Sequence, residues 1–123
     1  MPSLVRERLT SAIAHGAAIT TSSLVVFELW YGVAKSARSE VNARRLHTFL
    51  TGPVDVLDFD DADAEAAGTI RAALEAAGTP IGAYDTLIAG QATRRGMTLV
   101  TANTREFSRV DRLAWEDWAH AEG

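Results

Sequence analysis

Apolar positions recur along the chain with two different periods. Segments with apolar residues at helical spacing alternate with short apolar segments that are partly β-branched. The predicted helices cover residues 4–14, 24–33, 40–50, 60–77 and 84–95, and the predicted strands cover residues 17–20, 54–57, 98–101 and 113–115. Strands that alternate with helices in this way predict an α/β domain with a parallel sheet.

Turn residues separate most of these segments. Gly16 ends the first predicted helix, Gly52 and Pro53 end the third, and Gly96 ends the last. Ser22 or Ser23 can cap the second helix. We found no internal repeat, low-complexity tract or linker, so the 123 residues are predicted to form a single domain, residues 1–123.

The predicted helix over residues 24–33 is apolar on nearly every side, which is typical of a buried helix. Glu28 lies inside it. A carboxylate in such a place costs several kcal/mol to desolvate unless it is paired, protonated or bound to a metal, by an order-of-magnitude estimate. Glu28 is therefore a candidate for chemistry. The alternative is an ordinary glutamate at the edge of the core, paired with an arginine.

The composition narrows the class of protein. The hydrophobic fraction is 47%, as in a folded globular domain. The absence of cysteine excludes disulfides and thiolate metal sites and fits a reducing cytoplasm. No apolar run approaches the roughly 18 residues that a membrane span needs, and the charged N-terminus has no signal-peptide core. We therefore expect a cytoplasmic protein without a membrane segment.

The formal net charge of −4 bears on possible partners. A protein that holds a long nucleic acid by charge alone is usually basic. If the substrate is RNA, we expect a small site with a metal ion and a few arginines, and no broad basic face.

Parallel sheets place their sites beyond the carboxyl ends of the strands, which directs attention to residues 21–28, 58–61 and 102–106. Asp85, in the first turn of its predicted helix, should lie near them. By itself an acid there is ordinary N-terminal stabilisation, worth roughly 0.3–1 kcal/mol. Asn103 and Glu106 follow the third predicted strand, in a stretch that can equally be a plain polar loop.

Other candidate motifs point to no chemistry. Asp58, Asp60, Asp61 and Asp63 lack the glycine and distal glutamate of a calcium loop, so we interpret them as a strand exit and a helix N-terminus. The histidines show no zinc spacing, and phosphate-loop and serine-nucleophile motifs are absent. The aromatic pairs are interpreted as core or interface residues in preference to base-stacking platforms.

Three segments resemble a known family. SSLVVFELWYGVAKS (residues 22–36), PIGAYDTLIAG (80–90) and LVTANTREFSRV (99–110) look like the second, third and fourth acidic motifs of VapC-type PIN domains, in order and at family spacing. The closing LAWEDW (113–118) is similar to the family's usual end. The resemblance covers nearly the whole chain.

The resemblance implies a PIN-like three-layer α/β domain, in which helices flank a central parallel sheet. It also implies a metal-dependent endoribonuclease, the toxin of a toxin–antitoxin pair, with acids that hold Mg²⁺ or Mn²⁺ to hydrolyse RNA phosphodiesters. Glu28 and Asp85 match the second and third acids and are the implied metal ligands. Asn103 stands where many members carry a fourth acid, and Glu106 is the candidate substitute. Magnesium prefers such oxygen ligands. The candidate phosphate contacts are Arg94, Arg105 and Arg109.

The resemblance also implies partners. VapC-type toxins are neutralised by an antitoxin whose C-terminal segment covers the acidic site, and they commonly form homodimers. Trp30 and Tyr31, on the helix over residues 24–33, are the candidate contact surface for the antitoxin.

One departure from the family pattern matters. Family members begin with an apolar strand that ends in an Asp-Thr-Asn-type motif, and this chain is expected to begin after that strand. We therefore expect that a central strand and a primary metal ligand are missing, that its two neighbouring strands have unpaired edges, and that catalysis is weak or lost. Two alternatives remain open: a catalytically inactive PIN remnant that acts only by binding an antitoxin, and an unrelated doubly wound domain with structural acids. The last predicts Glu28, Asp85 and Asn103 far apart; the others predict them around one cavity.

Overall fold

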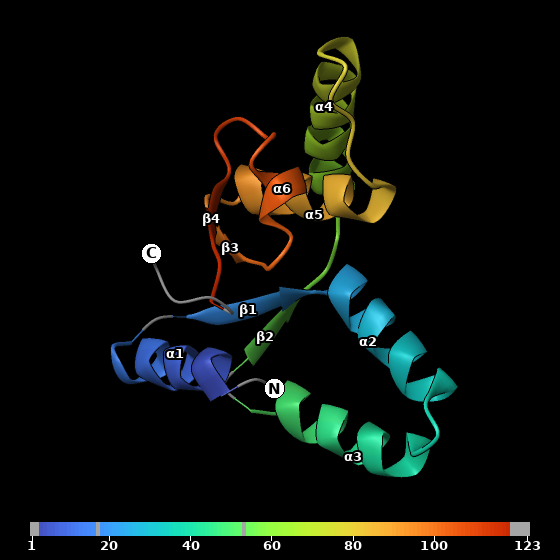
Figure 1. The fold of residues 1–123 in the computed structure, drawn as a ribbon, viewed down its shortest axis with the longest axis vertical. Coiled ribbons are helices and arrows are strands. Elements are labelled where there is room, and N and C mark those ends of the chain that lie inside the picture. Colours follow the sequence, from blue (N-terminus) through green and yellow to red (C-terminus); the bar gives the residue numbers. More distant parts are fainter. Residues whose placement is uncertain (1–2, 17, 53, 119–123) are drawn as a thin grey trace. The chain divides into compact units, whose positions relative to one another are not determined.

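The structure is a computed structural model and describes residues 3–16, 18–52 and 54–118 (Figure 1). Helices and strands alternate along most of it. The helices are α1 Ser3–Ala14, α2 Ser23–Lys35, α3 Ser39–Leu50, α4 Asp61–Ala76, α5 Ala83–Arg94 and α6 Thr104–Phe107, and the strands are β1 Ile19–Ser22, β2 Val54–Leu57, β3 Thr98–Val100 and β4 Ala114–Glu116.

The predicted elements agree with this order. Helices α1 to α5 lie within two residues of their predicted bounds, and β2 matches its prediction. Strand β1 begins at Ile19, later than predicted, and Ala17 lies outside the described residues. The short helix α6 was predicted as loop, because four residues are too few to show a helical period.

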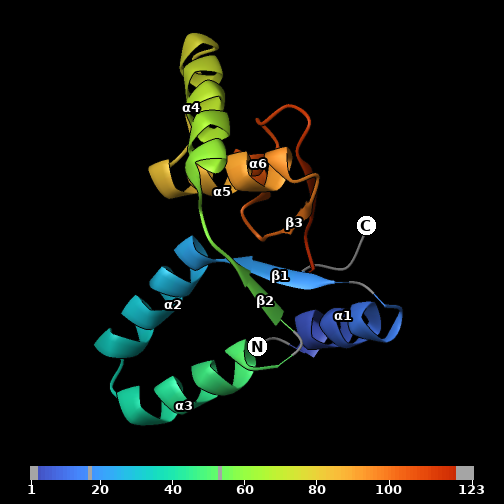
Figure 2. The same ribbon diagram turned by 180° about the vertical axis from the view of Figure 1, so that it is seen from behind.

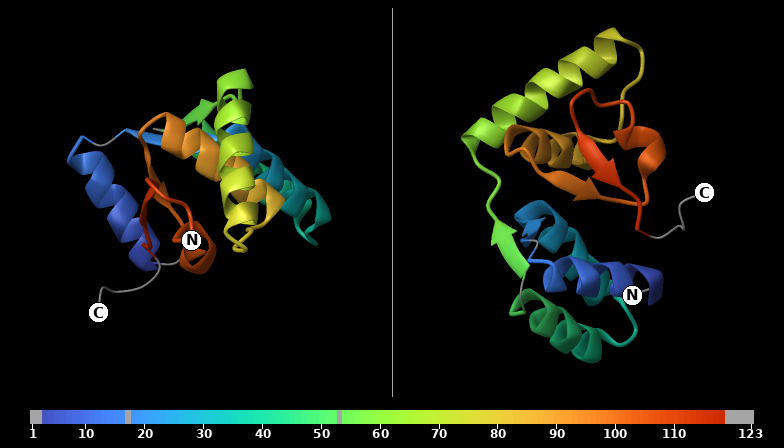
Figure 3. Two further views of the ribbon diagram at one scale, coloured as in Figure 1. Left: turned by 90° about the horizontal axis from the view of Figure 1, so that it is seen from above. Right: turned by 90° about the vertical axis from the view of Figure 1, so that its left-hand side faces the viewer.

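All four strands pair in parallel. Strand β1 pairs with β2 (Figure 2) and β3 pairs with β4 (Figure 3). In these pairs Ile19 lies opposite Val54, and Leu99 lies opposite Trp115. The α/β class and the parallel pairing are confirmed. The strands form two two-stranded sheets in place of one central sheet, because no strand in the described part of the chain pairs with both β1 and β3.

The chain divides into two compact units. The first, here the N-terminal unit, comprises Thr10–Phe59, and the second, the C-terminal unit, comprises Met1–Leu9 with Asp60–Gly123. The expectation of one domain over residues 1–123 stays a prediction.

The core of the C-terminal unit lies between α4, α5 and the segment that follows β3. Its buried apolar residues are Leu74, Ala89, Ala92, Phe107, Val110 and Leu113. Gly90 marks a close approach of the two helices, since a Cβ there would lie 2.6 Å from the backbone N and Cα of Ala67. Small residues therefore let α4 and α5 pack backbone to backbone.

The N-terminal unit contains β1, β2 and the helical hairpin of α2 and α3. The hydroxyl of Ser22 accepts a hydrogen bond from Leu24 N (3.1 Å) and caps α2, and Trp30 meets His47 edge-on, with ring centroids 4.8 Å apart. The prediction that α2 is a buried helix is wrong: none of its residues is buried, and Tyr31 is 60% exposed. Glu28 is likewise exposed. Its apolar composition could not show this, because burial depends on what packs against a helix.

No helix in the described residues is long and apolar enough to cross a membrane.

Candidate active site

The first turn of α5 positions Asp85. Gly82 caps the helix, and its carbonyl oxygen accepts hydrogen bonds from both the backbone N–H and the hydroxyl of Thr86, each at 3.0 Å. Thr86 is buried, so this turn is anchored in the core. Asp85 follows two residues after the start of α5 and is half-buried.

The segment after β3 brings two further polar side chains to this turn. The backbone N–H of Asn103 donates to the Thr101 hydroxyl at 3.0 Å, and Asn103 precedes α6. Within α6, the buried Phe107 anchors the helix in the core, and Glu106 beside it stays partly exposed.

Asp85, Asn103 and Glu106 form one polar cluster. The Asn103 amide Nδ2 donates to Asp85 Oδ2 at 2.9 Å and to Glu106 Oε2 at 3.2 Å. The backbone N–H of Gly82 donates to Glu106 Oε2 at 3.4 Å. A Cβ on Gly82 would lie 3.8 Å from each of these two carboxylate oxygens, which is ordinary van der Waals contact, so Gly82 borders the cluster. The unrelated-fold alternative predicted that Glu28, Asp85 and Asn103 lie far apart. The hydrogen bond between Asn103 and Asp85 contradicts it for this pair.

The cluster shifts the ionisation of Glu106. Hydrogen bonding with the Asp85 carboxyl group is the main cause that lowers the pKa of Glu106, followed by the Gly82 N–H; Asn103 and the charge of Arg109 lower the pKa further. The cluster therefore favours a charged Glu106 beside Asp85.

The donor set suits a hard cation. Two carboxylates and an amide are the ligands with which proteins hold Mg²⁺, usually with waters and substrate phosphate completing the shell. In the described residues no group of three or more His, Asp or Glu side chains is placed to hold a metal. Asp85 and Glu106 would therefore supply only part of the shell of such a cation, and waters and phosphate would complete it.

Glu28 is the one predicted acid outside this cluster. It lies on α2 of the N-terminal unit. Within the C-terminal unit the structure brings together Asp85, Asn103 and Glu106.

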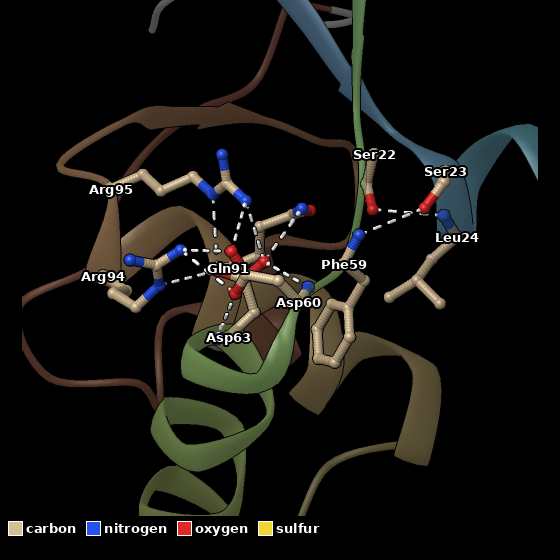
Figure 4. A network of polar contacts seen from close by, with 9 residues as sticks. All are labelled: Ser22, Ser23, Leu24, Phe59, Asp60, Asp63, Gln91, Arg94 and Arg95. Atoms are coloured by element: carbon tan, nitrogen blue, oxygen red, sulfur yellow. Dashed lines mark hydrogen bonds and ion pairs between the residues drawn. The ribbon is translucent and has the colours of Figure 1, made fainter.

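A second polar network, which the sequence did not predict, lies where α4 begins (Figure 4). Asp60 and Asp63 form a capping box: Asp63 N donates to Asp60 Oδ1 (2.9 Å), and Asp60 N donates to Asp63 Oδ2 (3.0 Å). The Asp63 side chain is fully buried. Arg94 Nε donates to Asp63 Oδ1 at 2.8 Å, and Arg95 Nη2 donates to Oδ2 at 3.0 Å. Gln91 Nε2 adds a weaker contact at 3.4 Å.

These contacts tie the C-terminal end of α5 to the N-terminus of α4. The hydrogen bond from Arg95 is the first cause that holds the pKa of Asp63 well below its usual value of 3.8, with the Asp60 N–H and Arg94 adding to it against the cost of burial. The Asp-x-x-Asp spacing of a capping box could have indicated the local part of this network. No sequence signal pairs it with the arginines, which lie 31 and 32 residues along the chain.

The three arginines predicted to contact phosphate have different surroundings. Arg94 is held by Asp63 and also pairs with Asp60 at 3.1 Å. Arg109 Nη1 donates to the carbonyl oxygen of Pro80 at 2.9 Å, which keeps its charge close to the Glu106 cluster. Arg105 is exposed.

Comparison with protein families identifies the domain. The model of the PIN domain matches residues 3–113, which is most of the chain. The chain belongs to the PIN domain family. Asp85, Asn103 and Glu106 thus form their cluster within the PIN domain.

Two curated relatives illustrate the similarity. The tRNA(fMet)-specific endonuclease VapC of Shigella flexneri is 43% identical over 118 residues, which cover 96% of this chain and 86% of the relative. The ribonuclease VapC2 of Rickettsia felis is 40% identical over 106 residues, which cover 86% of this chain and 78% of the relative.

Solved structures show a similar fold. DNA-bound VapBC from Salmonella typhimurium matches this PIN domain with a TM-score of 0.86 at 40% identity, over 95% of this chain and 86% of the other. VapBC2 from Rickettsia felis, bound to a DNA fragment from its promoter, matches with a TM-score of 0.88 at 37% identity and the same coverage.

Proposed function

We propose that this PIN-domain protein is a metal-dependent endoribonuclease that acts as the toxin of a toxin–antitoxin pair. The observation that carries the proposal is the Asp85–Asn103–Glu106 cluster, two carboxylates held side by side within a PIN domain. Relatives that are 40–43% identical are named as VapC ribonucleases or endonucleases, which supports RNA as the substrate.

The side chains have distinct proposed roles. Asp85 and Glu106 are proposed ligands of Mg²⁺ or Mn²⁺. Glu28, which matches the second acid of the family, is also proposed as a metal ligand. When bound, such a cation supplies an oriented water and stabilises charge on the phosphate. Asn103 positions the two carboxylates by donating to both, which reduces their mutual repulsion. The Gly82 N–H supports Glu106 in the same way.

The three candidate arginines differ in whether their side chains are free to contact an RNA phosphate. Arg105 is exposed, and Arg109 lies near the cluster, so we propose both as phosphate contacts. Arg94 would have to exchange Asp60 and the buried Asp63 for an RNA phosphate. We therefore propose that Arg94 stabilises the fold and does not bind substrate.

An antitoxin protein is the proposed partner, because the solved relatives are VapBC complexes. Trp30 and Tyr31 on α2 are its proposed contact surface, and Tyr31 is well exposed. Trp30→Ala should weaken antitoxin binding; unchanged affinity would count against this surface. We further propose a homodimer that acts in the cytoplasm.

The test is cleavage of a mixed RNA pool by the 123-residue chain with Mg²⁺, with Mn²⁺ and with a chelator. Asp85→Asn keeps the shape of the side chain and removes its charge, and Asp111→Asn, at an exposed aspartate that is not a member of the cluster, is the matched control. We expect metal-dependent cleavage that Asp85→Asn lowers by on the order of 100-fold or more and Asp111→Asn leaves unchanged.

Two other results would change the conclusion. A folded chain that binds antitoxin and cleaves no RNA under any condition would favour the inactive PIN remnant, which acts only by binding. Cleavage that survives Asp85→Asn would place the chemistry elsewhere or reveal a contaminating nuclease.

A further inference from the structure

The segment from the end of α2 to the middle of α3 carries a concentrated positive charge. Residues 35–45 contain Lys35, Arg38, Arg44 and Arg45, against a single acid, Glu40. A third of the chain's lysines and arginines thus lie in 11 residues, although the whole chain has a net charge of −4. We call these four side chains the basic hairpin surface.

These four cations are exposed and form no ion pair with the described residues. Several arginines of the C-terminal unit differ, since they are engaged in hydrogen bonds or ion pairs. The engaged side chains are Arg8, Arg71, Arg94, Arg95 and Arg109. The basic hairpin surface therefore offers charge that the fold does not itself use.

The hairpin presents the cations on an ordered backbone. Ser36 Oγ donates to Val33 O at 2.8 Å and accepts from Asn42 Nδ2 at 3.1 Å, which joins the end of α2 to the first turns of α3. Leu46 is buried on the inner side of α3, and Arg44 and Arg45 just before it point to solvent.

An exposed aromatic ring borders the surface. Lys35 Nζ lies 5.2 Å from the centroid of the Tyr31 ring, and Tyr31 is 60% exposed. A cation beside an accessible aromatic face is the combination with which proteins bind single-stranded nucleic acid, one contacting phosphate and the other a base.

We propose that the basic hairpin surface binds the phosphate backbone of the RNA substrate. The inference rests on the proposed nuclease function and adds a binding surface outside the acidic cluster. An otherwise acidic protein repels RNA at long range, so a local group of unpaired cations supplies the attraction. RNA is favoured over a protein partner because four exposed cations stand against a single acid within 11 residues of chain.

The test measures RNA binding apart from cleavage. Labelled bulk tRNA is titrated with the full chain in a chelator, at several salt concentrations, for wild type and for Arg44→Gln/Arg45→Gln. The matched control is Arg71→Gln/Arg112→Gln, which removes the same charge from exposed arginines of the C-terminal unit. Circular dichroism and the melting temperature verify that each variant is folded.

We expect Arg44→Gln/Arg45→Gln to raise the Kd for tRNA on the order of tenfold and to lower the slope of log Kd against log salt by roughly 1.4, about 0.7 for each lost contact. The control should change both quantities much less. Equal effects of the two double variants would overturn the proposal, because they would show a response to net charge alone. A loss of antitoxin affinity with unchanged tRNA affinity would overturn it in favour of a protein partner.

The outcome for this surface is separable from that for the nuclease. If wild type binds tRNA through the surface and cleaves nothing, the proposed catalysis fails and the binding surface stands. If wild type cleaves RNA and Arg44→Gln/Arg45→Gln binds tRNA and cleaves it like wild type, the surface proposal fails and the nuclease stands.

Discussion

The two helical hairpins of this protein differ in what holds them together. Helices α4 and α5 cross where Gly90 meets Ala67, and α5 buries small residues such as Ala89. Helix α2 is far more apolar, yet none of its residues is buried, and Phe27 is 56% exposed. Burial in these two hairpins thus follows the close approach of backbones more than the hydrophobicity of side chains. A helix is shielded from solvent only where another element packs closely against it.

The acidic residues of the two hairpins likewise differ in burial from what their sequence surroundings predict. Glu28, inside the most apolar helix, is exposed, whereas Asp63, at a polar helix start, is fully buried. Asp63 is tolerated there because Arg94 and Arg95 compensate its charge and satisfy its oxygens. The exposed apolar helix α2 is available to bind a partner. The ion pairs of Asp63 with Arg94 and Arg95 hold α4 and α5 together and so help to position α5.

The largest expected difference in stability is between alanine substitutions of two leucines, Leu74 and Leu29. Leu74→Ala in α4 removes a side chain that is 6% exposed and should lower the free energy of unfolding by about 3 kcal/mol. Leu29→Ala in α2, where the leucine is 40% exposed, should lower it by only about 0.5 kcal/mol. Urea denaturation measures both. Similar losses would mean that α2 is packed against a partner in solution.

Replacement of Gly90 and of Gly32 by alanine should change the stability of the protein in opposite directions. Gly90→Ala forces a methyl group into the backbone of Ala67 and should cost about 2 kcal/mol of unfolding free energy. Gly32→Ala in α2 meets no atom within 4 Å and should stabilise the protein by about 0.5–1 kcal/mol, because alanine favours helix. Thermal denaturation of the pair gives both signs. A harmless Gly90→Ala would refute the tight crossing.

The ion pairs of Asp63 with Arg94 and Arg95, here called the Asp63 clamp, predict that the stability of the fold depends on pH. Since the pKa of Asp63 is lowered in the folded state, its stabilisation is fully present above about pH 5 and is lost as the pH falls through 3.8 towards the lower folded-state pKa. Asp63→Asn should therefore be less stable than wild type at pH 7, with the difference shrinking below pH 4. Unfolding free energies at several pH values test this, with the exposed Asp61→Asn as control; a constant difference would contradict the clamp.

The sequence predicted the order of elements well, because helical and strand periods are local properties. Asp85, Asn103 and Glu106 were predicted from motifs, and the structure brings them together. The exposure of α2 and the burial of Asp63 were not predictable, since both depend on residues far along the chain. The roles of the site residues and of the arginines stay predictions.

The central claim is that the Asp85–Asn103–Glu106 cluster holds a divalent cation. Titration of the folded chain with Mn²⁺, followed by electron paramagnetic resonance without RNA, tests it most directly. We predict that wild type and Asp111→Asn bind Mn²⁺ equally, and that Asp85→Asn and Glu106→Gln each weaken binding by about tenfold or more. Equal Mn²⁺ affinity in all four proteins would contradict the account.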